Sequence, residues 1–285
     1  MKLKSAKEIL LIQKENWDDS ALGWENWRSE IHRMFRPVGE ELTSSLRLVG
    51  KERVLDVACG IGEPGLTIAG EFKSVEVHGI DLSDNMVEFA NKAAKARGLV
   101  NYLATTASAE AIPYDDNSFD AVVCRFGIMF FPLPEKAVRE FLRVLKPGGR
   151  LAVSAWGEPE DNPWAGRVIM QIRDRLGMPK PKPGEPDVFR FSDEGSLANL
   201  LKMGGVSETW QKHRSGLTIF GPPEEYWQMI SEAGGGIMKA LEEAGETKAS
   251  RIRQDVIRML QNEFSRDGRV MIEWTAMVAG GEKGF

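Results

Sequence analysis

The sequence predicts an α/β fold built around a doubly wound, mostly parallel sheet. Short apolar segments alternate along the chain with helical patterns in which apolar residues recur every three or four positions. Strands separated by helices pair in parallel through right-handed crossovers, so this alternation favours a sheet covered by helices on both faces. The parallel strands are expected at residues 54–58, 75–80, 101–106, 119–124 and 151–156.

The first strand leads into a glycine turn around which the chain is organised. Gly60 and Gly62 leave the backbone open to a bound molecule. Pro64 suits the first position of a helix, because its missing N–H is not needed there. The strand, the turn and the helix N-terminus together present backbone donors beside the carboxylate of Asp56.

This turn fits two classes of ligand. Gly60, Gly62 and Gly65 match the dinucleotide fingerprint, with Asp81 downstream at a spacing suited to a ribose, so an NAD(P)-dependent dehydrogenase is one alternative. A diphosphate near Asp56 is repelled, whereas a cationic head group is attracted. S-adenosylmethionine carries an ammonium and a sulfonium but no phosphate. Asp56 therefore favours S-adenosylmethionine as the cofactor.

The later strands also end in polar groups. Asp81 ends the second strand, where a carboxylate can accept both hydrogen bonds of a ribose diol, or can serve simply as a polar strand terminus. Ser83 is expected to cap the next helix, which stops near Gly98. A loop at 108–114 follows the third strand. Arg125 follows the fourth strand, where open α/β sheets form their binding crevice.

The N-terminal region is expected to be helical. Apolar residues between 27 and 38 fall on one helical face. Trp17 and Trp24 precede them in a loop-like stretch around Gly23. These two aromatic side chains either cover the edge of the sheet or form a lid over the bound cofactor.

Beyond the fifth strand the pattern changes. Residues 157–192 are rich in proline, which suits a cap or loop insertion better than another layer of the sheet. The other expected elements are a helix opened by Pro134 and ended by the turn at 146–149, a helix at 194–203, strands at 206–213 and 217–220, a largely helical region at 223–266 broken at 234–236, and a closing strand at 269–279.

Composition and charge exclude several classes. The chain has 285 residues with 37 basic and 42 acidic side chains, a net charge of −5 and no long run of either sign, so we expect no nucleic-acid partner. No signal peptide is visible and no stretch approaches the ~20 apolar residues of a membrane span, which predicts a cytoplasmic protein. Cys59 and Cys124 are either small buried hydrophobes or neighbouring thiols. His32, His78 and His213 lack ligand spacing, so we predict no metal.

Four segments in order resemble the class I S-adenosylmethionine-dependent methyltransferases, especially the branch of the ubiquinone/menaquinone C-methyltransferases. The resemblance extends over about residues 50–156. It implies a Rossmann-like, seven-stranded sheet whose last strand runs antiparallel, with a helical cap insertion. The segments are VLDVACGIG at 54–62, GIDLSDNM at 79–86, AEAIPY at 109–114 and VLKPGGRL at 144–151.

The resemblance also implies roles for individual residues. The glycine turn would hold the methionine end of the cofactor, and Asp81 would take the ribose hydroxyls. Leu82 and Met86 would lie against the adenine, and residues 109–110 would border its edge. Ser108 stands where the family often has an Asp that pairs with the adenine amino group, and a hydroxyl is a weaker acceptor. Arg125 faces the cofactor's amino acid end or the substrate, or is a surface arginine. The expected cofactor-binding residues are Asp56, Ala58, Gly60, Gly62, Asp81, Leu82, Met86, Ser108, Ala109, Glu110 and Arg125.

Aromatic and methionine side chains near the crevice predict an apolar or aromatic small-molecule acceptor. The Asn/Asp-Pro-Pro-aromatic tetrapeptide that related enzymes use to methylate amino groups is absent from the sequence, so we expect methylation on carbon or oxygen rather than nitrogen. Alternatively, these side chains pack the insertion onto the sheet. No catalytic base can be named, since His213 and the acid-rich helices are candidates only by elimination. A non-catalytic S-adenosylmethionine-binding protein is a further alternative. The expected substrate residues are Phe126, Met129, Phe130, Trp156, Trp164 and Trp227.

The predicted organisation has five parts. These are an N-terminal helical lid (1–50), an S-adenosylmethionine-binding core (51–156), an insertion with a further helix and strand of the core (157–220), a helical substrate cap (221–268) and the closing strand of the core (269–285).

Overall fold

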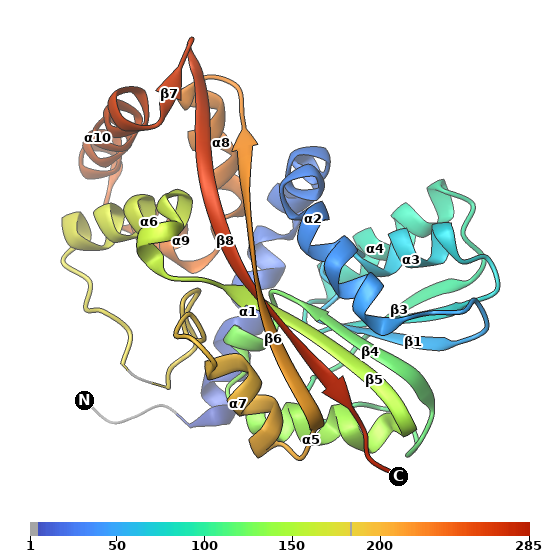
Figure 1. The fold of residues 1–285 in the computed structure, drawn as a ribbon. Helices are drawn as coiled ribbons and strands as arrows, with labels where there is room; N and C mark the ends of the chain where they lie inside the picture. Colours follow the sequence, from blue (N-terminus) through green and yellow to red (C-terminus); the bar gives the residue numbers. More distant parts are fainter. Residues whose placement is uncertain (1–4, 183) are drawn as a thin grey trace.

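A single mixed sheet forms the centre of the computed structural model, which describes residues 5–182 and 184–285. Its strands are β1 (Arg53–Val57), β2 (Glu76–Asp81), β3 (Tyr102–Thr106), β4 (Phe119–Arg125), β5 (Leu145–Trp156), β6 (Ser207–Ile219), the short β7 (Ser265–Arg266) and β8 (Arg269–Glu282). Their order is β3-β2-β1-β4-β5-β8-β6, with β7 paired to β8 (Figure 1). Strands β1 to β5 are parallel and β8 is antiparallel to both neighbours, which confirms the predicted doubly wound sheet.

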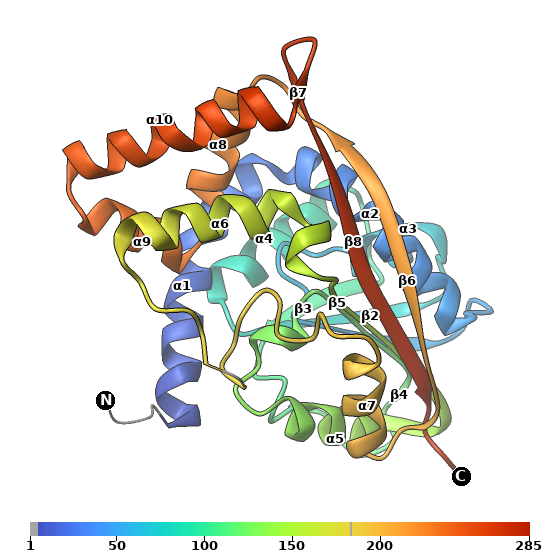
Figure 2. The same cartoon turned by 60° about the vertical axis from the view of Figure 1, so that its left-hand side comes forward.

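Helices cover both faces of this sheet (Figure 1). On one face lie α2, α3 and α4, and on the other α5 and α7, while the remaining helices gather beyond the carboxyl ends of the strands (Figure 2). The helices are α1 (Ala6–Asn26), α2 (Arg28–Leu46), α3 (Gly65–Glu71), α4 (Asp84–Ala96), α5 (Pro134–Val144), α6 (Pro163–Leu176), α7 (Ser196–Met203), α8 (Pro223–Ala233), α9 (Gly236–Glu243) and α10 (Glu246–Glu263), with 3₁₀ turns η1 (Ile128–Phe130) and η2 (Pro159–Asp161).

The two central strands explain the apolar segments of the sequence. Val54, Leu55 and Val57 of β1, and Val122 and Val123 of β4, are all fully buried. When helices cover both faces of a sheet, the side chains on both faces of its central strands are buried. Such a strand therefore has a continuous apolar sequence rather than an alternating one. The polar groups that interrupt or end these strands are therefore the ones that bear on function.

The N-terminal region contains one long helix where a loop was expected around Gly23. Ser5 and Glu8 form a capping box at its start, and α1 then continues without a break to Asn26. Gly23 lies against α8, where an added Cβ would stand 2.0 Å from the carbonyl oxygen of Glu232. The expectation of a loop is wrong because this glycine serves close helix packing and does not end the helix.

Gly23→Ala is therefore expected to destabilise the protein although alanine is the better helix former. The clash with a backbone carbonyl should cost about 1–3 kcal/mol of the free energy of unfolding. Gly70→Ala in α3 is the matched control, because its Cβ would meet nothing within 4 Å and should add up to ~1 kcal/mol. Urea unfolding of both variants checks the prediction, which fails if the two changes have the same sign.

The proline-rich insertion also contains a helix that the composition did not predict. Pro163 stands in the first turn of α6, where its missing N–H costs nothing, and Gly177 ends the helix in the left-handed conformation with φ 71°. Ala165, Val168 and Ile172 are fully buried along one side of α6. Pro163 therefore marks the start of this helix, and of the cap or loop insertion expected here, residues 163–176 form a helix.

Strand β6 is continuous where two shorter strands were expected. It pairs with β8 from Ser207 to Ile219. Gly216 lies opposite Trp274, and an added Cβ would stand 2.3 Å from the indole ring. The glycine interrupts the sequence pattern because it makes room for an aromatic ring on the paired strand. The resulting β6–β8 ribbon extends past the sheet toward α8 and α10 (Figures 1 and 2).

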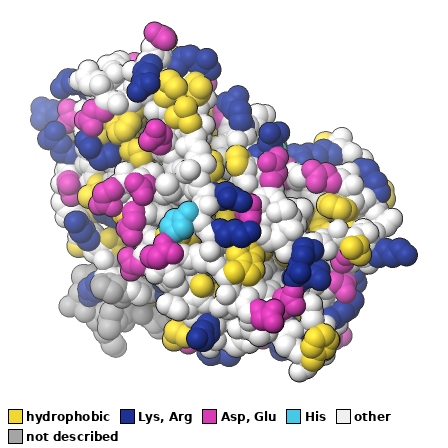
Figure 3. All heavy atoms as spheres, viewed as in Figure 1, with side chains coloured by type: hydrophobic (Ala, Val, Ile, Leu, Met, Phe, Trp, Pro, Cys, Tyr) yellow, Lys and Arg dark blue, Asp and Glu magenta, His cyan; other side chains and the backbone are white. Residues whose placement is uncertain are grey.

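The surface mixes charges of both signs. On the face seen in Figure 3, lysine and arginine side chains alternate with aspartate and glutamate side chains. Among residues 5–182 and 184–285, none of the helices combines the length and the apolar character that a membrane span requires. The same part of the chain has no cluster of three or more His, Cys, Asp or Glu side chains able to hold a metal ion.

Candidate active site

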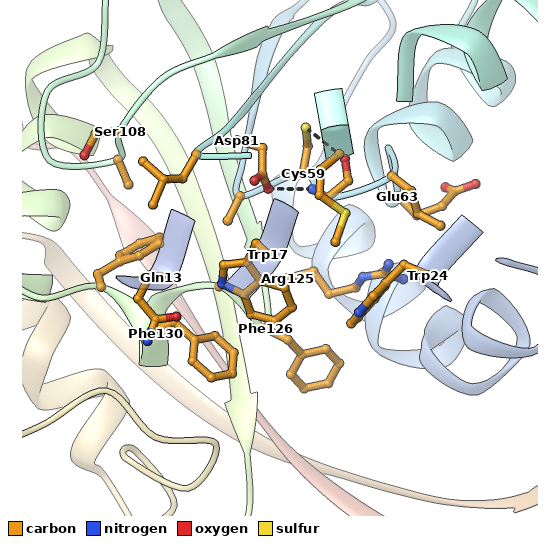
Figure 4. A pocket seen from close by; sticks show the side chains of 18 of the residues that line it. Gln13, Trp17, Trp24, Cys59, Glu63, Asp81, Ser108, Arg125, Phe126 and Phe130 are labelled. Carbon is orange, nitrogen blue, oxygen red and sulfur yellow. Dashed lines mark hydrogen bonds between the residues drawn. The ribbon is translucent and has the colours of Figure 1, made fainter. Parts of the chain in front are cut away.

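A cavity lies at the carboxyl ends of β1, β2 and β4, roofed by α1 and α2 (Figure 4). This is the edge at which open α/β sheets bind ligands. Nine of the eleven predicted cofactor residues line it. They are Ala58, Gly60, Asp81, Leu82, Met86, Ser108, Ala109, Glu110 and Arg125.

The backbone at this edge adopts unusual conformations. Ala58, Gly60 and Phe126 all line the cavity with positive φ values of 54°, 53° and 56°. Such values are uncommon for residues with a Cβ and persist where the surrounding structure imposes them, often at functional sites. A Cβ on Gly60 would meet no protein atom within 4 Å, so the backbone of the turn is bare toward a ligand.

Asp81 joins the glycine turn to the second strand. Its Oδ2 accepts a hydrogen bond from the Gly60 N–H at 2.8 Å (Figure 4), and its Oδ1 accepts one from the Ser83 N–H at 2.9 Å. Burial raises the pKa of the Asp81 carboxyl above its ordinary value. Ser83 in turn caps α4, as expected, by accepting from the Met86 N–H. Asp81 thus stands in the cavity wall, held from two sides.

The N–H groups of the glycine turn are used within the protein. Gly62 donates to the Cys59 carbonyl at 2.8 Å, and Gly65 donates to the Asp56 carboxylate at 2.9 Å. Together with the Gly60–Asp81 bond, all three glycine N–H groups of the fingerprint are already paired. A pyrophosphate at such a turn is bound by free N–H groups. The geometry therefore disfavours the dinucleotide interpretation.

Asp56 and Gly62 were expected at the cofactor and lie behind the cavity wall instead. The side chain of Asp56 is fully buried between β1 and α3, where Oδ2 accepts from the Gly65 N–H and Oδ1 has no hydrogen-bond partner among the described residues. Burial raises the pKa of this carboxyl to about 8. In this structure the Asp56 side chain supports the start of α3 through Gly65 and does not line the cavity, so a direct attraction to a cationic ligand stays a prediction. Gly62 is needed because a Cβ would stand 2.5 Å from Leu66.

The acid that faces the cavity from the turn is Glu63, which the sequence analysis did not single out. Burial acts to raise its pKa, but hydrogen bonds from Thr67 and the ion pair with Arg97 at 2.7 Å hold that pKa below its ordinary value. His32 of α2 stands beside it, with Nδ1 3.6 Å from Glu63 Oε1. Burial lowers the pKa of His32, with Glu63 opposing. No sequence spacing links residues 32 and 63, because the packing of α2 near α3 brings them together.

Two arginines complete this polar end. Arg28 donates to the Ile61 carbonyl at 2.8 Å and pairs with Glu25. Arg125 lies over the ring of Phe35, and burial lowers the pKa of its guanidinium while the carboxylates of Glu63 and Asp56 act in the opposite direction. Within residues 5–182 and 184–285, the Arg125 guanidinium has no ion-pair partner in contact. It is therefore available to a ligand and is not a surface arginine.

At the other end of the cavity, two predicted side chains are engaged inside the protein. Ser108 Oγ accepts from the Glu110 N–H at 3.2 Å, and Glu110 Oε1 accepts from the Leu133 N–H at 2.6 Å. These bonds shape the loop after β3 and join it to the segment after β4. The loop consequently lines the cavity without offering these two oxygens freely.

Of the six predicted substrate residues, Phe126 and Phe130 line the cavity. Trp156 is buried behind Phe126, on which it stacks at 3.9 Å, and Trp164 contacts the far edge of Trp156. Met129 and Trp227 are buried in the core, with exposed fractions of 1% and 6%. These four side chains therefore lie outside the lining of this cavity and belong to, or pack against, the hydrophobic core, so their contact with a substrate stays a prediction. His213 lies on β6, paired with Glu194 and away from the cavity.

Helix α1 closes the cavity from above. Leu10, Gln13, Trp17 and Trp24 all line it. Trp17 meets Phe130 edge to face, with ring centroids 5.2 Å apart, so α1 touches the segment after β4 across the opening. Both tryptophans therefore line the cavity, and the role of α1 as a lid over a bound cofactor stays a prediction.

The order and directions of the strands are those of the Rossmann-like fold of class I methyltransferases. Residues 55–153 match the family model described as a methyltransferase domain. Over 122 residues the chain is 41% identical to a ubiquinone/menaquinone biosynthesis C-methyltransferase of Syntrophotalea carbinolica, covering 42% of this chain and 51% of that protein. It is 42% identical over 109 residues to a demethylmenaquinone methyltransferase of Thermus thermophilus, covering 38% of this chain and 49% of the relative. The chain thus spans about half the length of these curated relatives.

Solved structures share the fold over most of the chain. The YcgJ protein of Bacillus subtilis has a TM-score of 0.57 at 21% identity, covering 88% of this chain and 99% of that one. The [4+2]-cyclase SpnF has a TM-score of 0.55 at 22% identity, covering 87% and 82%. Because a cyclase shares the fold, the fold alone does not establish methyl transfer, and the site has to carry that argument.

Proposed function

We propose that this protein transfers a methyl group from S-adenosylmethionine to an apolar or aromatic small molecule. The observation that carries the proposal is the state of the glycine turn. Its three glycine N–H groups are paired inside the protein, and its cavity side is lined by the acidic residues Asp81 and Glu63, of which Glu63 is also paired with Arg97. A zwitterionic sulfonium nucleoside suits this wall, whereas a diphosphate would find carboxylates and no free glycine donors.

Different residues around the cavity suit the ribose and the amino acid end of such a cofactor. Asp81 would accept the ribose hydroxyls, and Arg125 would pair with the carboxylate of the amino acid end. Glu63 lies at the same end, where it would favour the ammonium. The bound cofactor supplies a methyl group activated by its positive sulfur. The remaining task of the protein is to align the acceptor and to exclude water.

The acceptor side of the cavity is aromatic. Trp17, Phe35, Phe126 and Phe130 line it, and the rings of Phe35 and Phe126 are 5.1 Å apart. Flat apolar walls favour a flat or apolar acceptor. The relatives named for C-methylation of quinone precursors support carbon or oxygen methylation over nitrogen methylation for this chain. Buried free thiols at Cys59 and Cys124 support a cytoplasmic setting.

Calorimetric titration with S-adenosylmethionine, S-adenosylhomocysteine and NAD tests the cofactor. We expect the first two to bind and NAD to show no measurable affinity, and tight NAD binding without binding of the other two would instead favour a dehydrogenase. A product assay with quinols, phenols and amines then tests catalysis. Formation of S-adenosylhomocysteine with a quinol or phenol is expected. Binding without product from any acceptor would favour a non-catalytic S-adenosylmethionine-binding protein.

A further inference from the structure

Helix α1 runs along the length of the cavity and presents different side chains to its two ends. Figure 4 shows Gln13 and Ser108 on one side of Trp17, and Arg125, Glu63 and Trp24 on the other. The side with Arg125 and Glu63 is charged and suits a zwitterionic amino acid. If the proposed function is correct, the adenine ring therefore belongs to the side of the cavity with Gln13 and Ser108.

The side-chain oxygens expected at the adenine on this side each accept a hydrogen bond within the protein and keep further hydrogen-bonding positions. Ser108 Oγ accepts from the Glu110 N–H, and the Glu110 carboxylate accepts from the Leu133 N–H. The amide of Gln13 lines the same cavity and forms no hydrogen bond within residues 5–182 and 184–285. A polar side chain without a protein partner in a ligand cavity is available for the ligand.

A primary amide matches the amino edge of adenine. Its carbonyl can accept from the exocyclic amino group while its NH₂ donates to the neighbouring ring nitrogen, a bidentate pairing that Gln and Asn make with adenine in nucleic acids. We propose that Gln13 of the lid helix reads the adenine amino edge of the cofactor. This inference rests on the proposed function and adds a specificity-determining residue from outside the S-adenosylmethionine-binding core.

The contacts of α1 support this role because they fix Gln13 beside the nucleoside end. Lys14, the next residue, pairs with Asp84 of α4 at 2.7 Å. Asp18, one turn further along α1, accepts from the Ser83 hydroxyl at 2.6 Å. Ser83 also donates its N–H to Asp81, the residue expected to hold the ribose. The lid and the ribose site are thereby joined, so the base-reading side chain has a defined register.

The test compares binding of S-adenosylhomocysteine with that of S-inosylhomocysteine, in which an oxygen replaces the 6-amino group. The wild-type protein should prefer the adenosine compound by roughly tenfold or more. Gln13→Leu should lose roughly tenfold in affinity for it and lose the preference. Gln13→Glu keeps the acceptor for the amino group, so it should keep the preference.

Gln254→Leu makes the same substitution on the exposed surface of α10 and should bind as the wild type does. Thermal melting of each variant confirms that it is folded, and Gln13→Glu carries the test if Gln13→Leu does not fold. A Gln13→Leu protein with the wild-type preference, or a Gln13→Glu protein that favours inosine, overturns the inference while the proposed function stands. Wild-type protein that binds neither compound overturns the proposed function itself.

Discussion

Replacing Asp81 with alanine is expected to weaken the binding of S-adenosylmethionine by about a hundredfold in Kd. Two hydrogen bonds from ribose hydroxyls to a carboxylate contribute roughly 3 kcal/mol together, and each 1.4 kcal/mol is a factor of about ten. The loss also removes the bonds that Asp81 accepts from the N–H groups of Gly60 and Ser83, so the turn itself loses support. Isothermal titration calorimetry measures the change directly.

Two further variants separate an effect on cofactor binding from an effect on folding. Asp81→Asn keeps an oxygen acceptor but no charge, so its affinity should lie between those of the wild type and the alanine variant. Asp115→Ala, in an exposed turn, is the control for loss of a carboxylate elsewhere. An unchanged affinity in a folded Asp81→Ala protein would show that the ribose is held by another group.

The second large effect concerns Asp56 and appears as a pH dependence of stability. Burial raises the pKa of this carboxyl to about 8 in the folded protein, against 3.8 for an ordinary aspartate. Between these values the folded state holds a proton that the unfolded state has released. Stability from this group is therefore fully present at low pH and is lost as the pH rises toward 8, at up to ~1.4 kcal/mol per pH unit.

Asp56→Asn removes this titration while keeping an oxygen that can accept from Gly65. The free energy of unfolding of the wild type should therefore fall relative to that of the variant between about pH 5 and about pH 8. Asp120→Asn is the control. Burial acts to raise the pKa of Asp120, but hydrogen bonds from Arg53 and Lys146 hold that pKa below its ordinary value. Asp120 is therefore ionised in both the folded and the unfolded state between about pH 5 and about pH 8, and its contribution to the free energy of unfolding is constant over this range. Parallel curves for the wild type and Asp56→Asn would contradict the buried-acid account.

The spacing of apolar residues along the chain predicted most strands of the sheet. The residues at the ends of these strands predicted where the site lies. The apolar runs around Leu55 and Val122, separated by helical patterns, were sufficient for the parallel strands. Ser83 and Asp81 were found because a cap and a strand-ending acid are local features. The carboxyl ends of parallel strands meet at one edge of a sheet, and residues that end or follow β2 and β3 therefore reach the cavity. They are Asp81, Ser108, Ala109 and Glu110.

Two glycines and one proline were harder to interpret from the sequence, because the contacts that explain them are made with distant parts of the chain. Gly23 allows α1 to touch α8, Gly216 makes room for Trp274, and Pro163 begins a helix within a proline-rich stretch. Each residue type ordinarily signals an interruption. For the two glycines, the residue that each one packs against lies far along the chain. For Pro163, the helix that it begins is stabilised by burial of one face.

The amino-acid sequence by itself determined the strand–turn–helix unit, the acid at the end of β2 and the class of fold, because backbone hydrogen bonding and apolar periodicity depend on neighbours a few residues apart. Only the tertiary structure decided that Asp56 turns inward while Glu63 faces the cavity, that Trp156 lies behind Phe126, and that α1 brings Gln13 over the site. The physical reason is that the surroundings of a side chain depend on which element packs against it, and that packing joins residues whose spacing in the sequence carries no signal.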